Sequence, residues 1–212
     1  MKRSTCFCLA LLILWLPRIQ AADVFDLAEP AFGHIVDDFD LVKSNGIAQS
    51  PNGMMYISTQ KTIFTYDGYS SEALSYIDET GQLSQAWLGT SRELAFDSDG
   101  DLWAVTLIGG VLHYNIKTRK LVRYTSEADI ARRISSTYVF DLLLHKNQVW
   151  IATNRGLDRL DRDSGIISRN VIKLKELSER SIHAITIDKD DRIWVSVDEL
   201  GIYYSEDFGE SW

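Results

Sequence analysis

The sequence has almost no cysteine: Cys6 and Cys8 are the two such residues among 212, and both lie near the start. The first 21 residues read as a secretory signal peptide, with a basic start, an apolar run over residues 7–16 and a small-residue exit at Ala21. Cleavage after Ala21 would leave a mature chain without thiols, which excludes disulfides and thiol chemistry. A chain of this kind suits an oxidising compartment, so we expect the bacterial periplasm or the cell exterior.

Long apolar runs and an excess of basic charge are also missing. The run over residues 7–16 is too short to span a bilayer, and no other stretch comes close. Loss of Lys2, Arg3 and Arg18 with the signal peptide leaves 19 Lys and Arg against 30 Asp and Glu, a net charge of −11. This charge argues against nucleic acid as a partner. Acidic and basic residues are interspersed, which is typical of a solvated surface.

Motifs that carry catalysis or bind cofactors are absent as well. There is no HExxH, no GxSxG, no phosphate-binding glycine loop and no pair of histidines at metal-ligand spacing. The four histidines are His34, His113, His145 and His183, and none of them has a second histidine close by in the sequence. We therefore predict a protein that is not an enzyme and that has neither a metal nor a cofactor.

What the sequence does contain is a repeat. Four similar segments, residues 46–67, 93–115, 139–161 and 182–205, carry the aromatic anchors Tyr56, Trp103, Trp150 and Trp194 at spacings of 47, 47 and 44 residues. A period in the forties made of short strands is typical of propeller blades. The sequence predicts an all-β fold, a β-propeller of four-stranded antiparallel blades. About four blades are expected, over residues 46–91, 92–137, 138–181 and 182–212, so the ring would be incomplete.

The second repeat shows how one blade is expected to form. Its strands are predicted at residues 93–97, 101–106, 111–114 and 120–124, with a tight turn at Gly100 and a second break at Gly109 and Gly110. One such sheet cannot cover both of its faces, so the blades must stack. We expect Trp103 and its equivalents to fill the space between blades, and sugar stacking is the alternative role.

The repeats resemble the two-component regulator propeller repeat. Residues 97–106 (DSDGDLWAVT) with Gly110 and Tyr114 carry the resemblance, as do residues 149–153 (VWIAT) with Gly156. The resemblance implies the exported sensor region of a hybrid histidine kinase or a GGDEF protein. In such receptors a transmembrane helix and an output domain follow the propeller, so we expect this chain to be the front part of a longer receptor. Closure by self-association is the alternative.

The last eight residues, 205–212 (SEDFGESW), resemble the Asp-box of sialidase-type propellers. The resemblance implies a structural turn after the third strand of a blade, on the side away from an active site. We therefore expect no catalysis through Asp207.

Blade geometry also predicts where a ligand would bind. Turns between the first and second strands, and between the third and fourth, lie on one side of a propeller, and the other loops line the opposite funnel. The candidate funnel residues with charge or aromatic surface are Lys61, Trp87, Arg92, Tyr138, Arg155 and His183. We expect them to bind a small polar ligand such as a sugar or peptide, or a periplasmic protein.

Three readings of the function remain open at this point. The first is a ligand-sensing or binding propeller of a signal-transduction receptor, which would meet a membrane only through a missing C-terminal region. The second is a sialidase-like or lyase-like propeller hydrolase, and the third is a non-catalytic scaffold for assembly in the cell envelope. The N-terminal segment 22–45 could supply a ring-closing strand between Asp23 and Leu41.

Overall fold

The computed structural model describes residues 44–212, except for residues 79, 86–87 and 178. These residues belong to one compact unit, Asp37–Trp212. The expected signal peptide, most of the segment 22–45 and Trp87 lie outside the described residues. No helix occurs in the described part of the chain, and it accordingly contains none that could cross a membrane.

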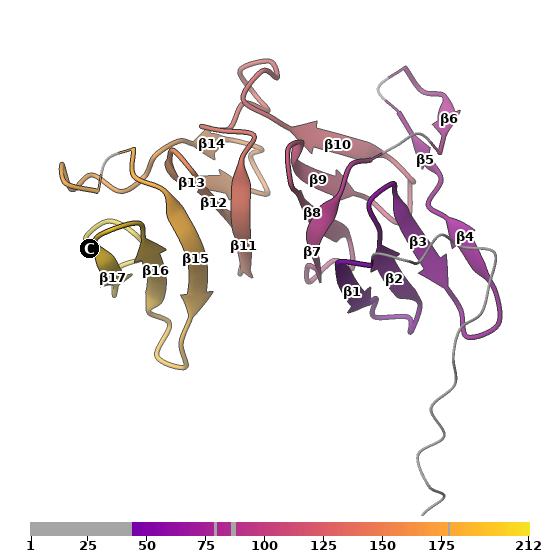
Figure 1. Ribbon diagram of the computed structural model, residues 1–212, viewed down its shortest axis with the longest axis horizontal. Helices are drawn as coiled ribbons and strands as arrows, with labels where there is room; N and C mark the ends of the chain where they lie inside the picture. Colours follow the sequence, from indigo (N-terminus) through magenta and orange to yellow (C-terminus); the bar gives the residue numbers. More distant parts are fainter. Residues whose placement is uncertain (1–43, 79, 86–87, 178) are drawn as a thin grey trace, which may run out of the picture. The chain divides into compact units, whose positions relative to one another are not determined.

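Seventeen strands make up the described structure, and most of them form four antiparallel sheets (Figure 1). The first sheet contains β1 (Gly46–Gln49), β2 (Met55–Ser58), β3 (Ile63–Tyr66) and β4 (Ser71–Ala73). The second contains β7 (Ser91–Phe96), β8 (Leu102–Thr106), β9 (Gly110–Tyr114) and β10 (Leu121–Tyr124). The third contains β11 (Val139–His145), β12 (Gln148–Thr153), β13 (Gly156–Asp161) and β14 (Ile167–Ser168). The fourth contains β15 (Ile182–Ile187), β16 (Ile193–Val197) and β17 (Gly201–Ser205).

This arrangement confirms the predicted β-propeller fold, and we call the four sheets blades 1 to 4. Each predicted strand of blade 2 lies within two residues of the observed one. Blade 4 has three strands in the described residues, so the set of blades is incomplete, as expected.

A short hairpin between blades 1 and 2 was not predicted. It consists of β5 (Tyr76–Ile77) and β6 (Leu83–Ser84), and it adds to the outer edge of blade 2. Ile77 forms a parallel bridge with Lys120, and its N–H donates to the carbonyl of Arg119 at 2.7 Å. Two-residue strands carry too little alternation to be recognised from the sequence.

The core of the described residues consists of three hydrophobic clusters, each between two consecutive blades. Blades 1, 2 and 3 each pack a forward face, which carries the aromatic anchor, on the rear face of the following blade. Trp103 and Trp150 are 1% and 0% exposed on the forward faces of blades 2 and 3. The predicted role of these tryptophans as filler between blades is therefore confirmed, and burying each contributes about 2 to 3 kcal/mol.

Three blades have a tryptophan as the aromatic anchor: Trp103, Trp150 and Trp194. In two of them the indole N–H donates to an aspartate in the turn between the first two strands of the blade. The Trp103 indole N–H donates to Asp97 Oδ2 at 2.8 Å, and that of Trp194 donates to Asp188 Oδ2 at 2.8 Å. In blade 3 the two strands continue to His145 and Gln148, so the turn between them has two residues, 146–147, against five in blades 2 and 4. Trp150 Nε1 and His145 Nε2 are consequently buried without hydrogen-bond partners. Blade 3 therefore lacks the hydrogen bond between the anchor indole and a turn aspartate that blades 2 and 4 have.

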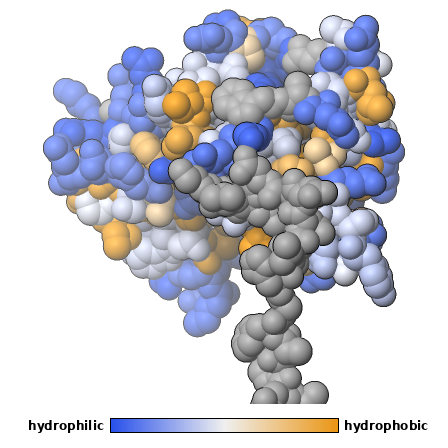
Figure 2. All heavy atoms as spheres, turned by 45° about the vertical axis from the view of Figure 1, so that its right-hand side comes forward, coloured by the Kyte–Doolittle hydropathy of each residue, from blue (hydrophilic) through white to orange (hydrophobic). Residues whose placement is uncertain are grey.

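The surface agrees with the interspersed charges of the sequence. Figure 2 shows hydrophilic residues over much of this view, with hydrophobic residues in separate spots. Large apolar side chains that are more than 60% exposed include Ile47, Tyr69, Leu83, Ile108, Ile130, Ile166 and Ile202. Two of these, Ile47 and Ile202, lie within blade sheets rather than in loops or at the outer edge.

Candidate functional site

Each blade has two edges, which we call the turn edge and the funnel edge. The turn edge carries the turns between the first and second strands and between the third and fourth. The funnel edge carries the loops between the second and third strands and the connections between blades. The same main-chain bond closes this edge in blades 2, 3 and 4: Leu107 N to Thr90 O at 2.8 Å, Asn154 N to Tyr138 O at 3.1 Å and Asp198 N to Ser181 O at 2.9 Å.

The innermost strands of three blades carry a β-bulge at the funnel edge. The pairing register shifts between Ser91 and Glu93 in β7, between Val139 and Asp141 in β11, and between Ile182 and Ala184 in β15. The extra residues are Arg92, Phe140 and His183. A bulge re-aims a side chain that a regular strand would point to one face, and such bulges are frequent next to functional sites.

Two of the three bulge side chains are in contact across the junction of blades 3 and 4. The rings of Phe140 and His183 lie 4.6 Å apart between centroids. His183 Nε2 also lies 3.4 Å from Asp198 Oδ1, in the loop between β16 and β17. Because His183 and Arg92 remain exposed, the bulges present aromatic and basic groups to solvent.

The remaining described candidates, Lys61, Tyr138 and Arg155, also lie on the funnel edge. Lys61 accepts a hydrogen bond from Leu88 N through its carbonyl at 3.2 Å, and Arg155 N donates to Thr153 Oγ1 at 3.1 Å. Tyr138 is 50% exposed and directly precedes β11. The described candidates therefore share an edge, and Arg92 and His183 occupy equivalent positions in blades 2 and 4.

A small apolar cavity lies on the same edge. It has a volume of ≈ 140 Å³, and its lining includes Leu88, Leu107, Ile108 and Arg123. Leu107 and Ile108 are 39% and 68% exposed, so the loop after β8 presents apolar surface, and its first residue bonds to Thr90, just before β7.

The residue after each bulge in blades 2 and 3 is acidic, and sequence reasoning missed the pair that results. The carboxyl groups of Glu93 and Asp141 hydrogen-bond across the junction of the two blades. Burial and the neighbouring Asp141 raise the pKa of Glu93 to about 7, while an N–H of Leu142 opposes the rise. Asp141 in turn accepts a bond from Ile185 N of blade 4 at 2.7 Å. Each acid thus bonds to the backbone just after the bulge of the next blade.

A buried aspartate fastens the long connections on both sides of blade 3. Asp158 is 0% exposed and accepts bonds from Ser135 N and Ser135 Oγ, both at 2.6 Å, and from Asn170 N at 2.8 Å. Burial raises its pKa, and the three donors oppose the rise. Asp158 is therefore a positioning residue for the funnel-edge connections, which a sequence search for motifs does not reveal.

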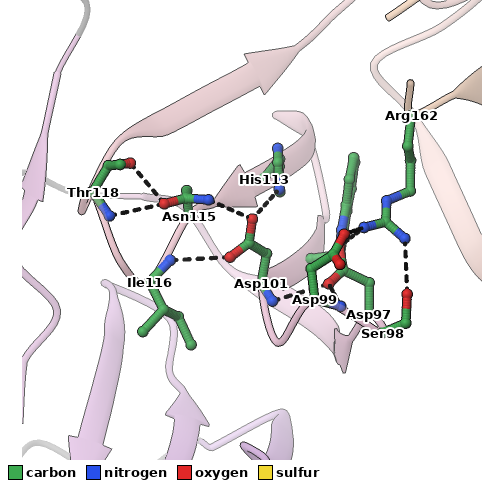
Figure 3. Close-up of polar contacts among 10 residues, drawn as sticks. Asp97, Ser98, Asp99, Asp101, His113, Asn115, Ile116, Thr118 and Arg162 are labelled. Carbon is green, nitrogen blue, oxygen red and sulfur yellow. Dashed lines mark hydrogen bonds and ion pairs between the residues drawn. The ribbon is translucent and has the colours of Figure 1, made fainter. Parts of the chain in front are cut away.

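The turn edge carries a cluster of side chains of the kind that bind metals (Figure 3). Ligand atoms of Asp97, Asp101 and His113 lie within 4.8 Å of one another. Asp101 Oδ2 accepts a bond from Asn115 Nδ2 at 2.6 Å and lies 3.3 Å from His113 Nε2, and Asp101 Oδ1 accepts from Ile116 N at 3.3 Å. Both carboxylate oxygens of Asp101 therefore already have polar partners within the protein.

Arg162 supplies a positive charge to the same cluster from blade 3. Its guanidinium lies 3.0 Å from Asp97 Oδ2 and also pairs with Asp99. A cation held next to this guanidinium would be repelled by it. The residues therefore fit a structural ion network better than a metal centre. The adjoining cavity of ≈ 240 Å³, between Trp103, His113 and Arg162, lies on the edge opposite the predicted funnel.

The segment after β17 forms a compact turn. Ser205 Oγ accepts a bond from Gly209 N at 2.7 Å, and Asp207 Oδ1 accepts from Ser211 N at 2.8 Å. Bonds from the hydroxyl and the N–H of Ser211, together with the hydroxyl of Ser205, lower the pKa of Asp207 to about 2. All the groups that contact this carboxylate belong to the turn, which is the geometry expected of a structural element.

With the fold and its two edges described, the chain can be compared with solved structures. It is similar to the extracellular domain of the hybrid two-component system BT3049 from B. thetaiotaomicron, with a TM-score of 0.65 and 19% identity, over 79% of this chain and 24% of that one. It is also similar to the extracellular domain of the one-component system BT4673 from the same organism, with a TM-score of 0.56 and 17% identity, over 79% and 25%.

A third solved structure is PorZ, a bacterial surface component of the type-IX secretion system of Porphyromonas gingivalis. The TM-score is 0.59 with 16% identity, over 83% of this chain and 28% of PorZ. The chain spans about a quarter of the length of each of these three structures. No protein-family model matches the sequence, and no curated protein matches it either. At these identities the likeness establishes the fold, and the first two structures are extracellular domains of signalling systems.

Proposed function

We propose that the chain is an extracytoplasmic sensing propeller of a bacterial signal-transduction system, and that it binds its ligand at the funnel edge. The observation that carries the proposal is the repeated bulge, which places Arg92, Phe140 and His183 at one position of three successive blades and leaves Arg92 and His183 exposed. The fold similarity to extracellular domains of signalling systems supports the location outside the cytoplasm.

The chemistry of the funnel edge suits a small polar ligand. Arg92, Lys61 and Arg155 offer cationic donors, and the adjacent rings of Phe140 and His183, tilted by 38° to each other, offer an aromatic surface. A guanidinium binds carboxylates and other planar acceptors, and aromatic rings stack on the apolar faces of sugars and peptides. We therefore infer a sugar or a peptide as the ligand class, with a periplasmic protein that presents such groups as the larger equivalent.

The test is a screen of sugars and short peptides by thermal stabilisation, followed by calorimetric titration of the compound that stabilises the protein. We expect Arg92→Ala and His183→Ala to raise the dissociation constant at least about tenfold, equivalent to about 1.4 kcal/mol. Lys117→Ala, an exposed cation on the turn edge, is the matched control and should leave the affinity unchanged. Equal affinities for all three variants would disprove binding at the bulges.

A second function is favoured by one specific observation, the likeness to PorZ. A scaffold for envelope assembly would use the blade edges for protein contacts and would need no small-molecule site. Purification with one partner in constant stoichiometry, together with no stabilisation by any compound of the screen, would support this alternative over sensing.

A further inference from the structure

The apolar cavity of the funnel edge lies where the connection from blade 1 enters blade 2. Its volume is ≈ 140 Å³, and Leu88, Leu107 and Ile108 supply its apolar wall. Pockets that take a whole small molecule measure about 300 to 1,000 Å³, whereas an apolar cavity of about 150 Å³ takes a group of the size of benzene. The cavity therefore suits one apolar side chain of a larger ligand, and it is too small for a whole sugar.

Main-chain bonds hold the walls of this cavity in place. Leu88 N donates to the carbonyl of Lys61, in the loop between β2 and β3, at 3.2 Å. Leu107 N donates to the carbonyl of Thr90 at 2.8 Å. Leu88 is 0% exposed, while Leu107 and Ile108 are 39% and 68% exposed. The cavity is thus formed before any ligand enters, and an apolar group inside it would gain from contact with these side chains.

A guanidinium lies beside the cavity. Arg123 belongs to the lining, and its Nη1 atom lies 2.9 Å from the point that a Cβ of Gly109 would occupy. The absence of a side chain at Gly109 therefore lets the guanidinium reach the loop between β8 and β9. No acidic side chain occurs among the described residues that line the cavity. Because a guanidinium has five N–H donors in a planar fork, Arg123 can bind a carboxylate in addition to its contacts within the protein.

These features define the chemistry of the group that fits. A ligand that fills the cavity and pairs with Arg123 needs an apolar group and a carboxylate close together. The last residue of a peptide has both, because its side chain and its carboxylate are bonded to the same carbon atom. A neutral sugar has neither group. The exposed Arg92, two positions after Thr90 of the lining, adds a second cation to the same stretch of chain and also favours an anionic ligand.

We propose that the ligand of the funnel edge is a peptide with a free C-terminal carboxylate and an apolar last residue of about the size of leucine. The last side chain fills the cavity, and Arg123 binds the carboxylate. The inference rests on the proposed function, because it selects the peptide from the two ligand classes inferred for this edge. The cavity determines which peptides are recognised, since a peptide that ends in a small residue leaves it empty.

The test is calorimetric titration of the full chain with three tripeptides: glycylglycylleucine, its C-terminal amide and triglycine. We expect glycylglycylleucine to bind at least about tenfold more tightly than either of the others, because triglycine leaves the cavity empty and the amide lacks the charge. Arg123→Gln should reduce the preference for the acid over its amide. Ile108→Asp should weaken the binding of glycylglycylleucine at least about tenfold, because it places a carboxylate at the apolar wall.

Ile130→Asp is the matched control, since Ile130 is 80% exposed and does not line the cavity. It should bind glycylglycylleucine as the wild type does, and near-ultraviolet circular dichroism checks that each variant is folded. Equal affinities for the three tripeptides would overturn the inference. An equal loss of affinity in Ile108→Asp and Ile130→Asp would overturn it as well.

Two further outcomes separate this inference from the proposed function. If no tripeptide binds, while a sugar from the screen binds and loses affinity in Arg92→Ala, the inference is wrong and the site at the bulges stands. If glycylglycylleucine binds with the expected dependence on Ile108 and Arg123, but Arg92→Ala and His183→Ala bind it as the wild type does, the cavity is the site and binding at the bulges is wrong.

Discussion

At the scale of single residues, Asp97 joins two blades. Its carboxylate accepts bonds from Asp99 N and Asp101 N, both at 3.0 Å, from the Trp103 indole, and from the guanidinium of Arg162. The side chain of Asp97 is 1% exposed and that of Arg162 is 12% exposed. One buried group thus fixes the turn, the anchor and the neighbouring blade.

We predict that Asp97→Ala lowers the free energy of unfolding by about 3 to 5 kcal/mol, because it leaves the Trp103 indole N–H without a partner and removes the buried member of the Arg162 ion pairs, so that the exposed Asp99 is the acidic partner that remains. Asp99→Ala is the control: Asp99 contacts the same Arg162, yet its side chain is 70% exposed, so the cost should be about 1 kcal/mol or less. Urea denaturation of both variants measures the difference. Equal losses would mean that the Asp97 network contributes no more than a surface ion pair.

A second prediction at this scale concerns Glu93 and pH. Its folded pKa of about 7 exceeds the ordinary 4.5, so between these values the folded protein binds more protons than the unfolded chain. The contribution of Glu93 to stability is therefore fully present below about pH 4.5 and is lost as the pH rises through about 7. Glu93→Gln, which stays neutral, should flatten this part of the stability profile. Denaturation midpoints measured from pH 5 to 8 test it, and an unchanged slope in the variant would contradict the assignment.

At the scale of the strand and loop, one glycine position recurs at the start of the third strand of a blade. Gly110, Gly156 and Gly201 all have positive φ, at 74°, 108° and 101°. At Gly110 a Cβ atom would overlap the carbonyl oxygen of Tyr124, whereas at Gly201 it would meet nothing within 4 Å.

This contrast predicts different costs for the same substitution. Gly201→Ala should cost about 1 to 2 kcal/mol, from the unfavourable backbone conformation alone. Gly110→Ala should cost at least about 1 to 3 kcal/mol more, because the backbone must also move away from Tyr124. Thermal denaturation of the two variants measures both. A Gly110→Ala variant as stable as Gly201→Ala would contradict the close approach of the two strands.

The elements also show what the sequence could and could not predict. The strands of blade 2 were predictable because apolar residues alternate around Trp103 and glycines mark the turns. The bulges were not, because a bulge adds one residue without changing composition: Arg92, Phe140 and His183 share a position but no chemistry. The pair of Glu93 and Asp141 and the buried Asp158 were missed for a related reason, since each depends on contacts between segments far apart in the sequence.

At the scale of the whole molecule, the propeller fold separates structure from recognition. The turn edge holds the satisfied polar networks around Asp97 and Asp188, which stabilise each blade. The funnel edge holds the bulges, which expose Arg92 and His183 to solvent. The predicted assignment of the loops to two edges followed from strand order alone, while the identity of the ligand depends on side chains that one sequence cannot interpret.

Calorimetric titration of the wild type and Arg92→Ala with the sugar or peptide that the screen identifies measures whether a ligand binds at the bulges of the funnel edge. We expect at least about a tenfold loss of affinity for Arg92→Ala and none for the turn-edge control Lys117→Ala. Full affinity in Arg92→Ala, or a loss confined to Lys117→Ala, would contradict binding at the bulges.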